Sequence, residues 1–266
     1  MRGVLSLLAA ATLALTLSAR ADAPFAAVDA LATEKAAAVE LLKHRTERQV
    51  ALAAGDRLFQ AYLNTASLGE AARLQPRIKA LLATLIGRYG IREVSVADRA
   101  GTFLARTGNY DRTVASLDPA ADPLLFAGLA AAPRRATTRQ DGLKLHVVAP
   151  VVLREQSEFV IDARQDMSSY HSALSYGLGG DRFIVLTDPT GVILADSRGA
   201  TGGTAIVAKL TLAAIRKAAP KGHGEVVGGE LRYRIAHRPV GDWTIIAVER
   251  VPAPRRCYAE GARLCG

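Results

Sequence analysis

The sequence predicts an α+β fold in which a long N-terminal helical segment precedes two similar units, each built around a central antiparallel sheet. Three observations predict this fold. Apolar and small residues recur every three to four positions from about residue 28 to residue 63. After Gly90 the pattern shortens towards alternation and becomes rich in β-branched residues. Finally, "VSVADRAGTFLART" at 94–107 returns in outline as "FIVLTDPTGVILADS" at 183–197.

The start of the chain has the pattern of a secretory signal peptide. Arg2 supplies a positive charge, residues 4–17 are apolar, and Ala19 and Ala21 frame a small-x-small cleavage site. The apolar run is shorter than the roughly 20 residues that cross a bilayer. We therefore expect cleavage after Ala21, so that 1–21 is a signal peptide, and export of a soluble protein to the periplasm or beyond the cell. Retention as an uncleaved anchor is the alternative.

The charge of the chain narrows the choice of partners. The formal net charge of +9 falls to +7 when Arg2 and Arg20 leave with the signal peptide. The basic residues are scattered and aromatic residues make up only 5% of the chain, so no basic cluster with interleaved stacking residues predicts a nucleic-acid site. We expect no nucleic-acid partner. A basic surface in an exported protein fits an anionic ligand, anionic lipid or a cell-wall polymer better.

Residues 22–90 are predicted to be a helical segment. The spacing of apolar residues over 28–63 predicts one long amphipathic helix with charged residues at the other positions. Gly69 interrupts the pattern. Pro76 suits the first turn of a second helix, and Gly90 is placed to end it.

Each repeat is predicted to be a β-hairpin closed by an Asp-x-x-Gly turn. The two aspartates, Asp98 and Asp188, lie ninety residues apart and are interpreted as turn formers. An aspartate at the start of such a turn accepts hydrogen bonds from its own backbone, and the glycine three residues later is free to take a positive φ. The repeat therefore indicates two copies of one architecture.

The remaining segments give both units a similar order of elements. In the first unit, an irregular excursion over 108–141 precedes two strands and a helix that ends near residues 177–180. Long irregular segments often carry binding residues. In the second unit, the hairpin is followed by a helix around residues 206–219 and by three closing strands, 224–227, 230–239 and 243–251.

In this order the pieces resemble the double Cache sensor domain, a PAS-like extracellular module of bacterial receptors. "VSVADRAGTFLART" resembles the family's first hairpin, and "GLKLHVVAPVV" followed by "SEFVIDARQDMSSYHSAL" is similar to the strands and linking helix that close the membrane-distal lobe. "FIVLTDPTGVILADS" resembles the proximal hairpin, and "GDWTIIAVERVP" resembles the closing strand. The resemblance covers roughly residues 28–252. It implies a membrane-distal lobe over 91–178, a membrane-proximal lobe over 179–252 and a tail over 253–266.

The resemblance also implies a small-molecule ligand in the distal lobe, between its sheet and the loops over it. The candidate ligand contacts are Tyr110, Asp111, Arg134, Arg135, Arg139, His146, Asp162 and Arg164. One amino-acid-binding subset of the family uses a Tyr, an Arg, an adjacent Trp-Tyr pair and an Asp for the ligand ammonium group. This sequence departs from that subset, because it has "LLFAG" where the aromatic pair is expected and its single Trp is in the closing strand.

Arg164 decides which class of ligand we expect. It lies two residues from Asp162, near the position of the ammonium-binding aspartate of the family. A guanidinium group that points into the lobe would repel an ammonium group and could grip a carboxylate with two hydrogen bonds. If Arg164 points inward, the ligand is therefore expected to be a carboxylate.

No arrangement of residues predicts catalysis, a metal or a cofactor. The chain has no Gly-x-Ser-x-Gly elbow, no His-Glu-x-x-His and no phosphate-binding glycine loop. His146 and His237 are interpreted as ordinary strand histidines with respect to metals, because a metal site needs further converging ligands. An exported hydrolase is the weakest of our hypotheses, and we expect a protein that is not an enzyme.

Both cysteines, Cys257 and Cys265, lie in the last ten residues. In an oxidising compartment they predict a disulfide that closes a short loop. A metal or redox pair is the alternative, but no histidine accompanies the cysteines and their spacing is not Cys-x-x-Cys.

Two functional hypotheses lead. The first is an exported sensory protein that binds a small molecule in its distal lobe and changes the activity of a partner by differential binding. Receptors of the resembled family continue into a membrane helix and a signalling domain, whereas this chain stops 14 residues after Pro252. We therefore expect a stand-alone protein that acts on a separate membrane receptor or histidine kinase. The alternative is a module without a ligand that docks to a receptor through its long helix, or forms a homodimer through it.

Overall fold

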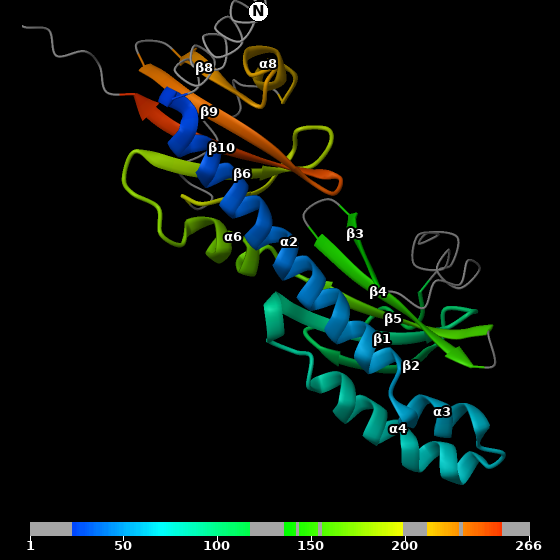
Figure 1. The fold of residues 1–266 in the computed structure, drawn as a ribbon. Helices are drawn as coiled ribbons and strands as arrows, with labels where there is room; N and C mark the ends of the chain where they lie inside the picture. Colours follow the sequence, from blue (N-terminus) through cyan, green and yellow to red (C-terminus); the bar gives the residue numbers. More distant parts are fainter. Residues whose placement is uncertain are drawn as a thin grey trace, which may run out of the picture. The chain divides into compact units, whose positions relative to one another are not determined.

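The computed structural model describes residues 23–117, 136–141, 144–153, 156–198, 212–228 and 231–251. The predicted signal peptide, Arg134, Arg135 and both cysteines lie outside these residues. The helices are η1 (Ala23–Phe25), α2 (Ala26–Ala54), α3 (Arg57–Asn64), α4 (Leu68–Ala83), η2 (Arg88–Gly90), α6 (Ser168–Ser175) and α8 (Leu212–Ala218) (Figure 1). The strands are β1 (Ile91–Asp98), β2 (Phe103–Gly108), β3 (Thr137–Asp141), β4 (Lys144–Leu153), β5 (Gln156–Gln165), β6 (Arg182–Thr187), β7 (Ile193–Asp196), β8 (His223–Gly228), β9 (Leu231–Val240) and β10 (Trp243–Val251).

The strands form two antiparallel sheets of five strands each. The strand order is β2-β1-β5-β4-β3 in one sheet and β7-β6-β10-β9-β8 in the other. Each strand of the second sheet therefore takes the place of the strand five earlier in the first. The predicted α+β fold with two similar antiparallel sheets is confirmed.

The two Asp-x-x-Gly hairpin turns have the same hydrogen bonds. The Asp98 carboxylate accepts from the backbone N–H groups two and four residues later, at 2.9 and 2.8 Å. Asp188 does the same at 2.8 and 2.9 Å. The glycines, Gly101 and Gly191, have φ angles of 83° and 92°, which residues with a side chain rarely adopt. The prediction that both aspartates are turn formers is confirmed.

The long N-terminal helix is shorter than the pattern over 28–63 predicts. α2 ends at Ala54, and α3 begins at Arg57. Gly55 lies at the break, and the Asp56 carboxylate accepts a hydrogen bond of 2.9 Å from the Leu58 N–H group. An aspartate at this position caps a new helix, so the apolar pattern continues across a break in the backbone.

The second helix begins earlier than predicted. α4 starts at Leu68, and Ser67 accepts a hydrogen bond of 3.1 Å from the Glu70 N–H group. This serine followed by a glutamate three residues later is a capping arrangement that the prediction overlooked. Pro76 therefore lies inside α4 and not in its first turn.

The described chain divides into two compact units. The β1–β5 unit comprises Ala38–Ala173, and the β6–β10 unit comprises the described residues up to Ala37 and from Leu174 onwards. α2 contributes residues to both. The predicted helical segment of residues 22–90 is thus divided between the two units.

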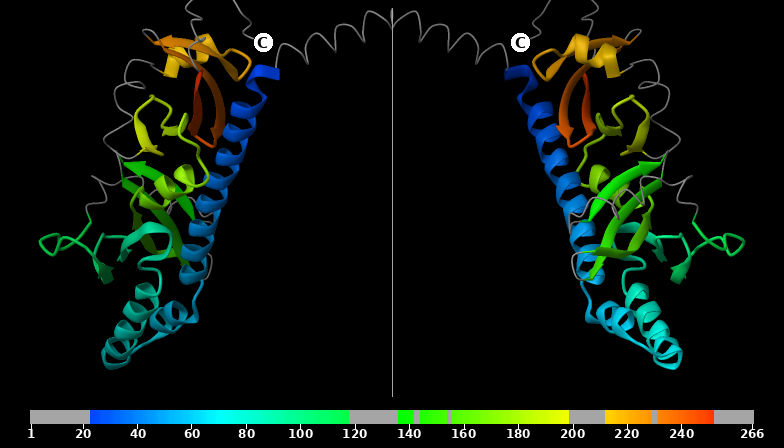
Figure 2. Two further views of the ribbon diagram at one scale, coloured as in Figure 1. Left: turned by 90° about the vertical axis from the view of Figure 1, so that its left-hand side faces the viewer. Right: turned by 90° about the vertical axis from the view of Figure 1, so that its right-hand side faces the viewer.

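One hydrophobic cluster of the β1–β5 unit lies on the face of its sheet that the helices cover. There the end of α2 packs with α3 and α4, which lie side by side (Figures 1 and 2). Buried residues of this cluster include Val50, Phe59, Ile78, Leu82, Val94, Val96, Val147, Ile161 and Ala163. Because side chains alternate along a strand, residues at the intervening positions of β1, β4 and β5 lie on the opposite face.

Helix side chains bond the backbone of both edge strands of this sheet. On β2, the Gln75 amide of α4 donates a hydrogen bond of 2.7 Å to the Leu104 carbonyl oxygen. On β3, the Glu47 carboxylate of α2 accepts from the N–H and hydroxyl groups of Thr138, at 3.0 and 2.8 Å. On each edge strand, at least one backbone group that an incoming strand could bond is therefore already hydrogen-bonded to a helix side chain.

Candidate ligand-binding site

The face of the β1–β5 sheet opposite the core carries a group of ionisable side chains. Glu93 on β1 is the strand partner of Arg164 on β5, and His146 on β4 is the partner of Arg164 from the other side. Asp162 lies two residues from Arg164 and therefore on the same face. We call this surface the polar face. The strands place its members close together although they are far apart in the sequence.

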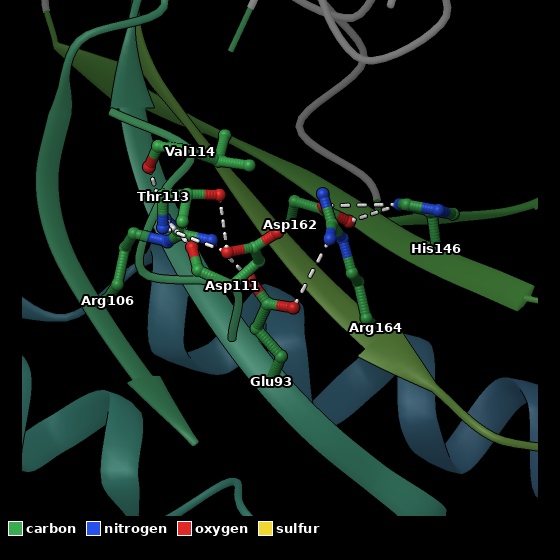
Figure 3. A network of polar contacts seen from close by, with 8 residues as sticks. All are labelled: Glu93, Arg106, Asp111, Thr113, Val114, His146, Asp162 and Arg164. Atoms are coloured by element: carbon green, nitrogen blue, oxygen red, sulfur yellow. Dashed lines mark hydrogen bonds and ion pairs between the residues drawn. The ribbon is translucent and has the colours of Figure 1, made fainter. Parts of the chain in front are cut away.

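Glu93 is shared by two arginines (Figure 3). One of its carboxylate oxygens accepts a hydrogen bond of 2.9 Å from Arg106 Nη2, and the other accepts one of 3.3 Å from Arg164 Nη1. The side chains of Glu93 and Arg106 are only 7% and 8% exposed, whereas Arg164 is 29% exposed. Glu93 and Arg106 therefore form a buried pair, and Arg164 is the member that solvent can reach.

Arg106 is held from several sides. Its guanidinium carbon lies 4.2 Å from the centre of the Phe103 ring and 4.4 Å from that of Tyr110. Nη1 donates to the carbonyl oxygens of Asp111 and Val114 at 3.1 and 2.7 Å. Nε is buried and has no hydrogen-bond partner among the described residues. A buried hydrogen-bond donor without a partner is rare in proteins, and an acceptor beside Arg106 Nε would satisfy it.

Asp162 is almost fully buried and faces two cationic or potentially cationic groups. His146 Nδ1 lies 3.0 and 3.1 Å from its two oxygens, and Arg164 Nε donates to it at 3.4 Å (Figure 3). An ammonium group that approached Asp162 would meet Arg164 as well. This carboxylate is therefore poorly placed to bind an amine.

The predicted loop candidates, Tyr110 and Asp111, lie beside the polar face, but only one presents its side chain to it. The Tyr110 ring packs on Arg106. The Asp111 carboxylate instead accepts hydrogen bonds from the hydroxyl and N–H groups of Thr113, at 2.7 and 2.8 Å. These bonds lower the pKa of Asp111 below its ordinary value. Asp111 thus orders its own loop, and only its carbonyl oxygen reaches Arg106.

The structure brings together three of the predicted candidates, namely His146, Asp162 and Arg164. Arg139 lies on β3, where its backbone is opposite His146. Arg134 and Arg135 lie outside the described residues. The Arg164 side chain points to the polar face, as the carboxylate hypothesis requires. Its ion pairs with Glu93 and Asp162 neutralise part of its charge.

Sequence reasoning missed Glu93 and Arg106. Both are charged residues that lie beside buried apolar residues in the two strands of the first hairpin, and this was the signal that could have found them. Pairing them requires the register of the hairpin, however, and a bulge between Val96 and Ala97 shifts that register. Counting outwards from the Asp-x-x-Gly turn therefore does not bring the right residues together.

Two hollows border the charged group. The smaller, of about 340 Å³, is lined by Glu93, Arg164, Lys144, Arg92, Asp111 and Asp166, among others. Burial raises the pKa of Asp166, but hydrogen bonds from Ser168 and Arg92 outweigh it and hold the pKa below its ordinary value. The larger, of about 750 Å³, includes Arg106, Tyr110, Lys79 and Arg112 in its lining, and none of the described residues that line it is acidic. Arginine and lysine thus line both openings next to the polar face.

The described part of the chain offers no group of three or more His, Cys, Asp or Glu side chains that could hold a metal ion. The chemistry of the polar face is therefore that of guanidinium, imidazole and carboxylate groups. Such a surface can bind an anion through charge-assisted hydrogen bonds.

The corresponding face of the β6–β10 sheet is apolar. In the sequence repeat, Phe183 takes the place of Glu93, and Val185 takes that of Ser95. This face packs against Ile215 of α8 in a cluster that also contains Phe183, Val185, Tyr233, Ile235, Ile246 and Val248. The two units thus share a strand order but differ in the chemistry of the same face.

Solved structures with the same fold are sensor domains. The ligand-binding domain of the Campylobacter jejuni chemoreceptor Tlp3, in complex with L-valine, matches with a TM-score of 0.68 and 10% identity over 88% of this chain and 95% of that chain. The sensor domain of the V. cholerae histidine kinase DctB matches with a TM-score of 0.54 and 15% identity over 90% of this chain and all of that chain.

These similarities establish the fold. The chain has the double Cache architecture of sensor domains found in chemoreceptors and histidine kinases, as the sequence resemblance implied. The similar structures are the sensory domains of these proteins. No protein-family model and no curated protein matches the sequence. None of the helices in the described ranges is long and apolar enough to span a membrane.

Proposed function

We propose that the protein is an exported sensory protein whose β1–β5 unit binds a small organic anion, with a carboxylate as the preferred group. The observation that carries this proposal is the sharing of one buried carboxylate, Glu93, by two arginines, one of which is partly exposed at a hollow. Arg164 and its neighbours Arg92 and Lys144 line this hollow. A carboxylate ligand would add a second anion to a place where guanidinium groups already converge.

The charge arrangement supports a carboxylate over an amine. The hydrogen bonds from Arg164 to Glu93 and Asp162 measure 3.3 and 3.4 Å, which is long for charge-assisted bonds. Arg164 can therefore turn towards a ligand at a small cost in lost bonds. Asp162, by contrast, is already bonded by His146 and Arg164. Tlp3 has been crystallised with L-valine and with isoleucine, so amino acids are tested beside simple carboxylates.

A thermal-shift screen of the mature protein against carboxylates, amino acids, amines and nucleobases tests the proposal. A ligand that binds only the folded state raises the melting temperature. Compounds that do so are then titrated by calorimetry into the native protein, Arg164→Gln and Arg77→Gln. Arg77 is exposed on α4 and lies outside both hollows, so it controls for the loss of one charge.

We expect carboxylates to bind and Arg164→Gln to weaken them about tenfold or more, since a hydrogen bond to a charged group contributes about 1.5–3 kcal/mol. Arg77→Gln should bind as the native protein does. A flat screen, or ligands that bind Arg164→Gln unchanged, would contradict the proposal.

Export and a separate partner belong to the same proposal. The sequence of residues 1–21 supports export, and N-terminal sequencing of the secreted protein should find Asp22 first. A disulfide between Cys257 and Cys265 should then change the mass of the C-terminal peptide on reduction.

The similar sensor domains belong to a chemoreceptor and a histidine kinase, which supports a membrane receptor or kinase as the partner. Crosslinking in cells, with and without the ligand, tests this step.

Two exposed leucines on α2 support the alternative function, an interaction module that dimerises or docks to a receptor through its helix. Leu41 and Leu52 are 49% and 61% exposed, and eleven residues place them on the same side of a helix. Leu52→Glu should then convert a dimer to a monomer in light scattering. Leu68→Glu on α4, which makes the same change at another exposed leucine, should not. A native protein that is monomeric at all concentrations contradicts the homodimer.

A further inference from the structure

A third hollow with arginine side chains lies in the β6–β10 unit. Its volume is about 460 Å³, within the range of small-molecule pockets. Its lining combines an apolar part with guanidinium groups: Phe183, Leu231 and Tyr233, and Arg182, Arg198 and Arg250. Asp181 is the single acidic residue among the described residues that line it. Positive charge therefore exceeds negative charge at the wall of the hollow.

Arg198 is fixed in place by two neighbours. Its guanidinium carbon lies 3.4 Å from the centre of the Phe183 ring. Its Nε and Nη2 donate to the two oxygens of Asp196 at 3.3 and 3.2 Å, and its backbone N–H group donates to the same carboxylate at 2.9 Å. This bidentate pair occupies one edge of the guanidinium group and leaves Nη1 without a hydrogen-bond partner among the described residues. A guanidinium that is already oriented loses little entropy when it binds an anion.

Arg250 supplies a cation that none of the described carboxylates neutralises. Its side chain is exposed, and within the described ranges it has no ion pair. Its backbone N–H group donates to the Asp181 carbonyl oxygen at 2.8 Å, which fixes the strand beside the hollow. Arg182, in contrast, is paired with Glu249 at 2.8 Å. Arg250 is therefore the described cation best placed to receive an anion, and Arg198 can add Nη1 while its other nitrogen atoms stay bonded to Asp196.

We infer that this hollow is a second binding site, for a small organic carboxylate with an apolar or aromatic body. The two guanidinium groups would hold the carboxylate, and the body would cover Leu231 and the rings of Phe183 and Tyr233. Phe183 and Tyr233 are almost fully buried. They form the floor of the hollow and also belong to the hydrophobic cluster of the unit. The site is independent of the polar face, because all its residues belong to the β6–β10 unit.

Fluorine NMR with 4-fluorobenzoate as the probe tests this site in the mature protein. The variants are Arg250→Gln and, as a matched control, Arg216→Gln, an exposed arginine on α8 that does not line the hollow. A third variant, Arg164→Gln, removes the exposed cation of the polar face. The neutral isostere 4-fluorobenzamide and inorganic phosphate serve as competing ligands.

In the Arg164→Gln background, which removes binding at the polar face, we expect saturable binding of 4-fluorobenzoate that a further Arg250→Gln weakens about tenfold and a further Arg216→Gln leaves unchanged. No saturable binding, or binding unaffected by Arg250→Gln, overturns the inference. A loss in Arg164→Gln alone also overturns it and assigns the probe to the polar face. Equal binding of 4-fluorobenzamide rejects recognition of the carboxylate, and equal competition by phosphate rejects recognition of the apolar body.

Discussion

Glu93 accepts hydrogen bonds from two different arginines, and no other described carboxylate of the polar face does so. Its loss would leave the guanidinium group of Arg106 buried with its two carbonyl partners and no counter-charge. Removing one member of a buried ion pair typically costs about 3–5 kcal/mol.

Glu93→Gln should therefore lower the free energy of unfolding by about 3 kcal/mol in urea titrations followed by circular dichroism. Glu158→Gln is the control. Glu158 lies 3.9 Å from Arg99 in an exposed pair, for which we expect a change of no more than about 1 kcal/mol. Equal losses in the two variants would show that burial of the Glu93 pair does not matter for stability.

Asp166 makes the stability of the protein depend on pH. Its pKa in the folded protein is lowered, because hydrogen bonds from Ser168 and Arg92 outweigh burial, which raises the pKa. A carboxyl group with a lowered folded pKa stabilises the protein above its unfolded pKa, about 3.9 for aspartate. That contribution disappears as the pH falls through the folded pKa.

Asp166→Asn isolates this charge, because asparagine can still accept the hydrogen bond from the Ser168 N–H group. The difference in unfolding free energy between the native protein and the variant should be constant above about pH 5 and should shrink below about pH 4. Urea titrations between pH 2 and 7 measure it. A difference that persists unchanged at pH 2 would mean that the charge of Asp166 plays no part.

At the scale of elements, the two hairpin turns provide an internal comparison. Asp98→Ala and Asp188→Ala each remove one carboxylate that accepts two backbone N–H bonds. We expect each to lower the free energy of unfolding by about 1 kcal/mol, since the turn stays exposed and water replaces part of the bonds. Asp242→Ala, in the exposed turn between β9 and β10, should stay within about 0.5 kcal/mol. A large difference between the two hairpins would contradict their equivalence.

The helices show that the spacing of apolar residues does not reveal where a helix breaks. The apolar spacing over 28–63 predicts helix correctly on both sides of Gly55, but one glycine and one capping aspartate redirect the chain without breaking that spacing. Pro76 was misplaced for a related reason, because proline suits the first turn of a helix and α4 nevertheless tolerates it in its interior. The hairpins were predictable because their turns depend on residues only three apart.

At the scale of the whole molecule, the described hydrophobic clusters of the two units share no residues. The clusters of the β1–β5 unit draw on residues between Val50 and Ala163, and that of the β6–β10 unit on residues between Phe183 and Val248. Glu93→Gln should therefore speed amide hydrogen exchange in β1, β2, β4 and β5 and leave β6, β9 and β10 nearly unchanged. Hydrogen exchange with mass spectrometry measures this, since exchange reports local opening. Equal acceleration in both sheets would show that the units open together.

The double Cache architecture could be predicted from the sequence because two hairpins, a Pro-containing strand pair and a closing strand recur in a fixed order. The site could be predicted only in part. His146, Asp162 and Arg164 lie on strands that the sequence identifies, whereas Glu93 and Arg106 meet through a bulged register that spacing does not reveal. Which face of each sheet is charged depends on the same register. The fold can therefore be predicted from the sequence, whereas locating the site requires the structure.

The bonds that Gln75 and Glu47 make to the edge strands have a consequence for self-association. An exposed sheet edge invites a strand from another molecule, which is a route to aggregates. In the β1–β5 unit an incoming strand would have to displace a side-chain amide at Leu104 and a carboxylate at Thr138 before it could pair at these positions. These two side chains therefore make the edges of this sheet poorer templates for a strand from another molecule.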